Sequence, residues 1–213
     1  MSMYRARSWL LVAVIAAAAM LGAWLLKPVL QPKPAPVLQS AQLYPQAKVL
    51  APFALQDQHG QPFTNERLRG KWSFVFFGYT TCPDICPTTL TVFTQLYKQL
   101  PAALQADTQM VFATVDPERD TVAQLQQYMP FFHADFIGLT GEPTAVDAFA
   151  RSFGVAYSKI PQEGGSYLVD HSVRVFLINP EGGRHALFAP TQGAGFEAKR
   201  LLSDYQNIRA QLE

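Results

Sequence analysis

The sequence predicts an α/β protein in which helices flank a central mixed sheet, with an extra hairpin at the start of the domain and one transmembrane helix before it. Two observations predict this class. Continuous apolar runs, typical of buried strands, alternate with segments whose apolar residues recur at helical spacing. The composition, 49% hydrophobic and 15% charged over 213 residues, is that of a globular domain carrying one unusually apolar segment.

The apolar segment lies near the start of the chain. Residues 9–26 carry no charge, and their number is close to the roughly 20 residues needed to cross a bilayer core. We therefore expect a transmembrane anchor over 9–26 after a short cytoplasmic tail over 1–8. Arg5 and Arg7 in that tail favour a single-pass protein of the inner membrane, with its C-terminal domain in the periplasm or an equivalent exported compartment.

A signal peptide cleaved at an Ala-x-Ala site is the alternative interpretation of this segment. The apolar run continues through residues 21–26, beyond its alanine cluster, and is longer than the usual cleavable core of about 7–15 residues. Trp9 and Trp24 stand near its two ends, where aromatic side chains suit the membrane interface. Both features favour a retained anchor.

A proline-rich linker is expected over residues 27–47, with the folded domain over 48–213. Five prolines suit an extended spacer: Pro28, Pro32, Pro34, Pro36 and Pro45. From Pro34 onward the chain has 13 Lys and Arg against 16 Asp and Glu, a net charge of 13 − 16 = −3. This mildly acidic balance argues against a nucleic-acid partner.

The first elements of the domain are a hairpin, a strand and a helix. The hairpin is expected over residues 53–63 with its turn at His59-Gly60. Trp72 to Phe77 form a continuous apolar run, the pattern of a strand buried on both faces. A helix then follows the two cysteines and stops at Pro101. Its apolar positions recur at helical spacing: Leu90, Phe93, Leu96, Tyr97 and Leu100.

The remaining elements continue the alternation of strands and helices. In order they are a strand at 110–115, a helix to about 129, a strand at 136–139, a helix at 144–153, a hairpin of 173–178 with 186–188, and a helix at 196–211. Such an order calls for a sheet covered on both faces, with functional sites at the C-terminal ends of strands.

Cys82 and Cys86, the only cysteines in the sequence, stand four residues apart where the strand at 72–77 gives way to a helix. Pro87 suits the first helical position, which predicts Cys86 at the helix N-cap and Cys82 in the preceding loop. The positive end of the helix dipole would stabilise a thiolate there.

This cysteine pair has three possible uses: a disulfide, a nucleophile with its resolving partner, or a metal clamp. A separation of four residues is compatible with the Cα distance of about 4.4–6.8 Å in a disulfide, and an exported domain makes one reasonable. Two thiolates are too few for a closed metal site, so a metal would need a third ligand from elsewhere in the chain.

Four histidines could supply that ligand. His59 and His185 are expected to be solvated loop residues, and His133 to end a helix. His171 differs because it lies in Asp170-His171-Ser172, directly before the strand from Val173. Two thiolates and one imidazole suit Cu(I), whereas zinc would want a fourth ligand, such as water or Asp84.

Three ordered segments resemble the Sco/SenC family of copper chaperones, and the resemblance covers roughly residues 48–210. The segments are Phe77–Pro87 (FGYTTCPDICP), Val115–Thr121 (VDPERDT), and Asp170–Ser172 with Leu177–Gly182 (LINPEG). The family consists of membrane-tethered proteins of thioredoxin-like fold that act in cytochrome c oxidase assembly. Val122 and Asn179 depart from the usual pattern, where proline and aspartate are common, and neither is an expected ligand.

The resemblance implies a copper site, for Cu(I), Cu(II) or both, made by Cys82, Cys86 and His171, with Asp84 at most beside it and residues 116–121 as a structural loop. It also implies a metallochaperone rather than an enzyme, whose partners are a copper acceptor, such as a cytochrome c oxidase subunit, and a thiol-disulfide reductant.

The alternative function is a thiol-disulfide oxidoreductase or peroxiredoxin-like protein without a physiological metal. Such reductases usually carry Cys-x-x-Cys and a cis-proline facing the cysteines. Here the spacer has three residues, and Asp170–Ser172 stands in the place of that proline. Some family members are thought to reduce the cysteines of their target, so a redox role can coexist with copper transfer.

Overall fold

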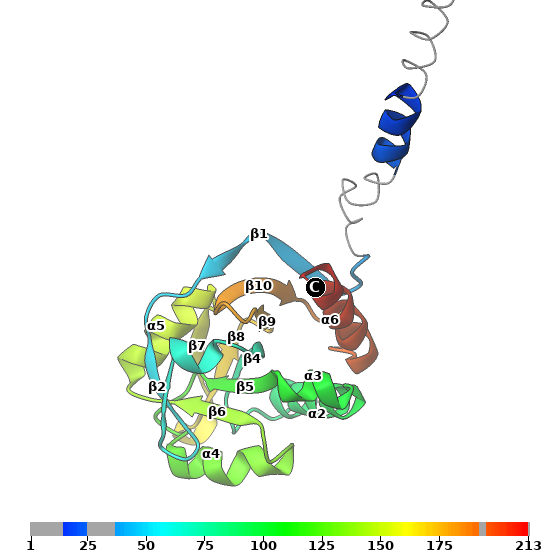
Figure 1. Ribbon diagram of the computed structural model, residues 1–213. Helices are drawn as coiled ribbons and strands as arrows, with labels where there is room; N and C mark the ends of the chain where they lie inside the picture. The colour runs from blue at the N-terminus through cyan, green and yellow to red at the C-terminus, as the bar shows by residue number, and fades with distance from the viewer. Residues whose placement is uncertain (1–14, 25–36, 192–194, 213) are drawn as a thin grey trace, which may run out of the picture. The chain divides into compact units, whose positions relative to one another are not determined.

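The computed structural model describes residues 15–24, 37–191 and 195–212 (Figure 1). The chain divides into two compact units, Met1–Pro36 and Val37–Glu213. In the first unit, residues 15–24 are helical. No helix among the described residues has both the length and the apolar character to cross a membrane. The expected tail over 1–8 and the rest of the expected anchor, 9–14 and 25–26, lie outside the described residues.

The second unit is built on an eight-stranded sheet with the order β1-β10-β9-β4-β5-β6-β2-β3 (Figure 1). Its strands are β1 Ala41–Val49, β2 Ala54–Asp57, β3 Pro62–Thr64, β4 Trp72–Gly78, β5 Thr108–Thr114, β6 Ile137–Thr140, β9 Val175–Ile178 and β10 Gly183–Phe188. The β4–β5 and β5–β6 pairs are parallel, and the other pairs are antiparallel. The sheet is therefore mixed, as predicted, and β2 and β3 form the predicted hairpin.

Five helices and three short 3-10 turns accompany this sheet in the described part of the second unit. The helices are α2 Ile85–Gln99, α3 Ala102–Ala106, α4 Val122–Tyr128, α5 Pro143–Phe153 and α6 Ala198–Leu212. The 3-10 turns are η1 Asn65–Leu68, η2 Met129–Phe131 and η3 Glu163–Gly165.

The central strand β4 is buried along its whole length, as its apolar run predicted. On one face, the Phe74 and Phe76 rings lie 6.0 and 6.4 Å from the Phe93 ring of α2. On the other face, the Phe77 ring lies 5.6 and 5.1 Å from the Phe149 and Phe153 rings of α5. Successive side chains of a strand point to opposite faces, so helices cover β4 from both sides and hold its C-terminal end in place.

The domain begins earlier than the sequence indicated, since β1 occupies part of the expected linker over 27–47. This strand pairs antiparallel with β10 at the edge of the sheet, and its register shifts between Leu43 and Lys48. Pro45 lies within that shift, and edge strands tolerate proline because one row of their N–H groups needs no partner. Pro45 of the expected linker therefore belongs to a strand, and the compact unit starts at Val37. Residues 27–36 of that linker lie outside the described residues.

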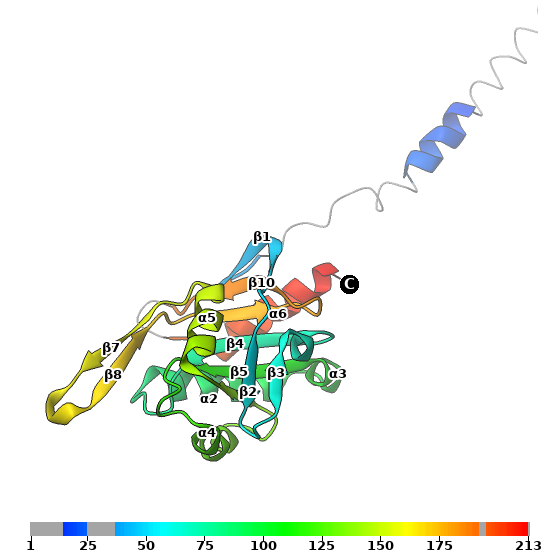
Figure 2. The ribbon, with the colours of Figure 1, turned by 90° about the vertical axis from the view of Figure 1, so that its left-hand side faces the viewer.

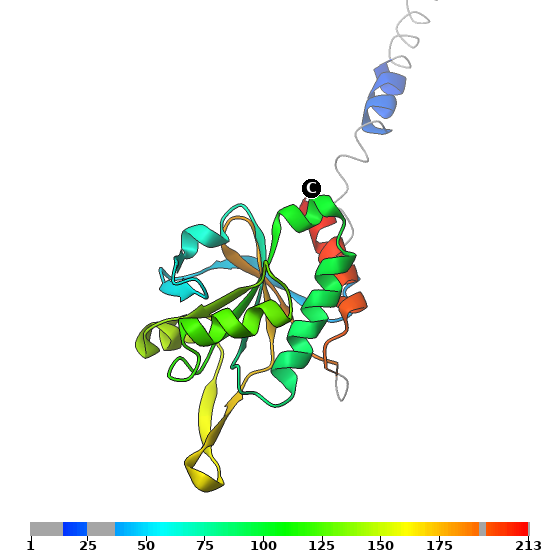
Figure 3. The same cartoon turned by 90° about the horizontal axis from the view of Figure 1, so that it is seen from below.

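A second small sheet, which no sequence pattern predicted, is formed by β7 Tyr157–Pro161 and β8 Tyr167–His171. The hairpin extends away from the main sheet (Figures 2 and 3). Most of its residues are exposed or half-buried, so it lacks the apolar run that marks a core strand. This hairpin affects the site directly, because His171 is the last residue of β8.

Candidate metal centre

The cysteine loop connects the end of β4 to the start of α2. The helix begins at Ile85 with Asp84 as its N-cap residue, so Cys86 lies inside the first turn and not at the N-cap. Pro87 follows within that turn, where backbone N–H groups have no intrahelical partner and a missing one costs little. Cys82 lies in the loop, half-buried, and Cys86 is buried; neither forms a disulfide.

The Cys86 sulfur sits in a recess that only glycine at position 78 leaves open. A Cβ atom added at Gly78 would lie 2.7 Å from Cys86 Sγ and 2.8 Å from a ring carbon of Phe112. Real Cβ atoms essentially never approach so closely. The glycine that ends β4 thus sets the position of the buried thiol.

His171 brings its ring against this thiol from the end of β8. Its Nε2 lies 3.5 Å from Cys86 Sγ, across 85 residues of sequence. Its Nδ1 lies 3.3 Å from the Ser172 carbonyl oxygen. A carbonyl oxygen can only accept, so when Nδ1 carries the ring proton it can donate to Ser172, and Nε2 is then free to bind a metal. The Phe76 and Tyr79 rings, both 6.1 Å away, hold the imidazole edge-on.

The two cysteines differ in their electrostatic environment. The pKa of Cys82 is lowered, chiefly by its interaction with Cys86. Burial has the opposite effect, but His171 and nearby backbone groups lower this pKa further. The same hydrogen bond, together with burial, raises the pKa of Cys86. The pair therefore shares one proton, with the thiolate on Cys82, the more accessible of the two sulfurs.

The three side chains influence one another, since Cys86 and His171 make direct contact and both lower the pKa of Cys82. A sulfur and a nitrogen bound to one metal ion at about 2.3 and 2.0 Å would lie roughly 3.5–3.7 Å apart, which agrees with the distance from Cys86 to His171. In the described part of the chain, however, no three His, Cys, Asp or Glu side chains are already arranged to hold a metal ion. The donor types fit a thiophilic metal.

An open pocket of about 340 Å³ gives access to this group. Its polar lining includes Cys82, Asp84, Asp170 and His171, and much of the rest is apolar, from both the cysteine loop and the β7–β8 hairpin. Asp84 is exposed at the edge of this pocket, and its side chain makes no cap hydrogen bond.

The other three histidines lie elsewhere. His59 is exposed in the hairpin turn, as expected, and the His133 ring packs 4.9 Å from that of Tyr97. His185 was expected in a solvated loop, but it lies within β10, where its ring meets Trp72 edge-on at 5.6 Å. Burial there lowers the pKa of His185. The short, mixed pattern of β10 made this strand appear to begin three residues later, at residue 186 instead of Gly183.

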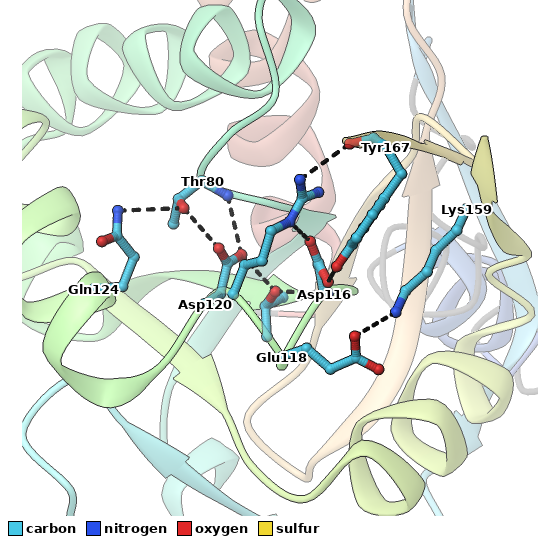
Figure 4. A network of polar contacts seen from close by, with 9 residues as sticks. Thr80, Asp116, Glu118, Asp120, Gln124, Lys159 and Tyr167 are labelled. Atoms are coloured by element: carbon cyan, nitrogen blue, oxygen red, sulfur yellow. Dashed lines mark hydrogen bonds and ion pairs between the residues drawn. The ribbon is translucent and has the colours of Figure 1, made fainter. Parts of the chain in front are cut away.

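The acidic loop over 116–121 has the structural role that was expected, and a closer link to the site than the sequence revealed. The Thr121 hydroxyl caps α4 by accepting a hydrogen bond from the backbone N–H of Gln124 at 3.2 Å. Asp120 is fully buried and accepts from the Thr80 amide at 3.0 Å, from the Thr80 hydroxyl at 2.6 Å and from the Thr114 hydroxyl at 2.6 Å (Figure 4). It thereby fixes the start of the cysteine loop.

Comparison with known proteins agrees with this architecture. The SCO1/SenC family model matches residues 41–205. A protein of Stutzerimonas stutzeri named "putative copper-binding protein" is 39% identical over 156 residues, which make up 73% of this chain and 76% of that protein. The structure of Arabidopsis thaliana ScoI with copper bound superposes with a TM-score of 0.68 at 36% identity, covering 76% of this chain and 99% of that one. Yeast Sco1 with copper bound gives a TM-score of 0.66 at 32% identity, over 76% of this chain and 89% of that one. The chain has the thioredoxin-like α/β fold of these structures and belongs to the SCO1/SenC family.

Proposed function

We propose that this protein is a copper chaperone that binds the metal through Cys82, Cys86 and His171 and delivers it to the copper site of a cytochrome c oxidase. The contact of Cys86 Sγ with His171 Nε2 at 3.5 Å is the observation that carries the proposal. Family membership and copper-bound relatives support the choice of metal.

Each of the three side chains has a separate task in this function. Cys82, which carries the thiolate and lines the pocket, meets the incoming ion first. Cys86 then loses its proton to solvent as the metal replaces the hydrogen bond between the sulfurs. His171 completes a soft three-coordinate set that suits Cu(I). An acceptor that docks at the open pocket can take over the ion by ligand exchange.

Oxidation of the two cysteines would abolish copper binding at this site. A disulfide between Cys82 and Cys86 forms by exchange with a disulfide of a partner protein, which takes up two electrons and, with the proton of Cys86 and one from solvent, leaves as two thiols. A disulfide sulfur is a poor metal ligand. A thiol-disulfide reductant is therefore required to restore the copper-binding state.

The location we propose follows from the sequence. The apolar stretch over 9–26 would anchor the protein in the inner membrane, and Arg5 and Arg7 favour export of the domain to the periplasm or an equivalent compartment. Protease treatment of intact spheroplasts tests this: the domain should be degraded, whereas a cytoplasmic domain would survive.

Copper titration tests the ligand set. The reduced full-length protein in detergent is titrated with Cu(I) against a competing chelator, alongside Cys82→Ser, Cys86→Ser and His171→Ala. Each of these variants should bind copper much more weakly than the wild type. His59→Ala, which removes an exposed imidazole in the turn between β2 and β3, should bind copper normally. Unchanged affinity in His171→Ala would refute the three-ligand assignment.

The thiolate on Cys82 also favours a second candidate function, thiol-disulfide exchange without a metal. An insulin-reduction assay on the copper-free protein decides between the two. Slow, stoichiometric reduction agrees with the chaperone, and fast catalytic turnover would favour the oxidoreductase.

A further inference from the structure

The β7–β8 hairpin carries His171 but forms a sheet separate from the eight-stranded one (Figures 2 and 3). The ladder of backbone hydrogen bonds that fixes β4 and Gly78 therefore does not fix the histidine. Its distance from Cys86 is set by the short link over residues 172–174 to β9 and by the side-chain contacts that fasten this hairpin to the domain.

One face of β8 makes those contacts. Along the strand, Tyr167, Val169 and His171 are half-buried or buried, whereas Leu168 and Asp170 between them are exposed. This alternation is that of a strand with one face against the protein. Tyr167 and His171 thus lie on the same face, and fixing the first constrains the second.

Arg119 and Asp116, from the loop after β5, hold Tyr167 at three points. The Arg119 Nη1 donates to the Tyr167 carbonyl oxygen at 3.0 Å, and the guanidinium carbon lies 3.8 Å from the centre of the Tyr167 ring. The Tyr167 hydroxyl donates to the Asp116 carboxylate at 2.9 Å (Figure 4). Asp116 is fully buried and forms an ion pair with Arg119 Nε.

The same guanidinium also reaches the cysteine side of the site. It lies 5.6 Å from the centre of the Tyr79 ring, and that ring packs edge-on against His171. Arg119 therefore lies between the hairpin and the cysteine loop and contacts both.

We propose that Arg119 is a positioning residue that clamps the β7–β8 hairpin through Tyr167 and so holds His171 at Cys86. This inference rests on the proposed function, because it assigns Arg119 an effect on copper binding that passes through His171. Groups that orient metal ligands typically change metal affinity 10- to 100-fold when they are removed.

The hairpin offers a matched control for this clamp. Lys159 of β7 forms an ion pair of 2.6 Å with Glu118 of the same loop, but both side chains are largely exposed, at 43% and 60%. Exposed ion pairs contribute little to the stability of a fold. Lys159 Nζ also lies 4.7 Å from the centre of the Tyr167 ring. Lys159→Met therefore removes a cation that joins the same two segments, and it leaves both hydrogen bonds of Tyr167, to Arg119 and to Asp116, in place.

A double-mutant cycle tests the clamp. Cu(I) affinity of the reduced full-length protein is measured for Arg119→Met and Lys159→Met, each alone and combined with His171→Ala. We expect about a tenfold loss in Arg119→Met alone, almost none in Lys159→Met, and no further loss when Arg119→Met is added to His171→Ala. Wild-type affinity in Arg119→Met, or an equal loss in both backgrounds, would overturn the proposal. If His171→Ala itself binds copper normally, the proposed function fails instead.

Hydrogen exchange of the copper-free protein gives a readout that does not depend on the metal. Arg119→Met should speed exchange in β7 and β8 and leave β4 and β5 unchanged; unchanged exchange in the hairpin would contradict the clamp. If the buried Asp116 carboxylate, left without its ion-pair partner, prevents folding, Tyr167→Phe, which removes only the hydroxyl, takes the place of Arg119→Met. Tyr167→Phe should show a smaller increase in hydrogen exchange of β7 and β8 and a smaller loss of Cu(I) affinity. If Tyr167→Phe matches the wild type in both measurements, the proposal is overturned.

Discussion

Replacement of Gly78 by alanine tests how the fold positions Cys86. The new methyl group would lie 2.7 Å from Cys86 Sγ and 2.8 and 3.2 Å from the rings of Phe112 and Phe76. These rings are fully buried, so the sulfur and its helix must give way. Overpacking of this kind costs about 1–3 kcal/mol. For a domain of this size, that corresponds to a fall in Tm of about 2–12 °C.

The same shift should weaken copper binding. Displacement of Sγ by a few tenths of an ångström disturbs its distance to His171, and we expect about a tenfold loss of Cu(I) affinity. Gly138→Ala is the matched control, because its Cβ would lie equally close, 2.7 Å, to the Met129 side chain, away from the cysteines.

Calorimetry and chelator competition, on both variants with their thiols reduced, separate the loss of stability from the loss of Cu(I) affinity. Gly138→Ala should lose stability and keep its copper affinity, whereas Gly78→Ala should lose both. The reasoning is refuted if Gly78→Ala binds copper as the wild type does, or if both variants lose affinity equally.

Two further predictions concern the edge of the domain and the thiol pair. Asp204 of α6 is fully buried and accepts hydrogen bonds from the backbone N–H groups of Gln39, Ser40 and Ala41 at 2.8, 2.7 and 2.9 Å. Asp204→Asn should therefore lower the free energy of unfolding, measured in urea, by about 1.5–3 kcal/mol. Glu197→Gln, in an exposed pair, should change it by at most about 1 kcal/mol, and equal effects would argue against a docked β1. Because the folded-state pKa of Cys82 is lowered, its thiolate persists as the pH falls from 8 to 5, and alkylation followed by peptide mass spectrometry should modify Cys82, not Cys86, across that range. A rate for Cys82 that drops about tenfold per pH unit from pH 8, as for an ordinary thiol, would contradict this assignment.

The sequence predicted the elements whose residues carry a strong pattern. The run Trp72–Phe77 identified β4 because a strand buried on both faces must be apolar throughout. Helical spacing identified α2, and the three motif segments assigned Cys82, Cys86 and His171 to one site. Cys86 and His171 do meet in the folded domain.

Other features could not be predicted because their stability is not local. Proline in β1 is typical of a linker unless the strand is known to lie at a sheet edge. The β7–β8 hairpin is mostly exposed, so its residues show little preference for a buried strand. The contacts of Arg119 and Asp116 with Tyr167 span 48 and 51 residues, and no spacing rule connects them.

The ligand set is the central claim, and X-ray absorption at the copper edge tests it most directly. On the reduced full-length protein loaded with one equivalent of Cu(I), we predict two sulfur scatterers and one imidazole nitrogen, with the nitrogen lost in His171→Ala. A site of sulfur alone, or a spectrum that His171→Ala leaves unchanged, would contradict the assignment of Cys82, Cys86 and His171 as the copper ligands.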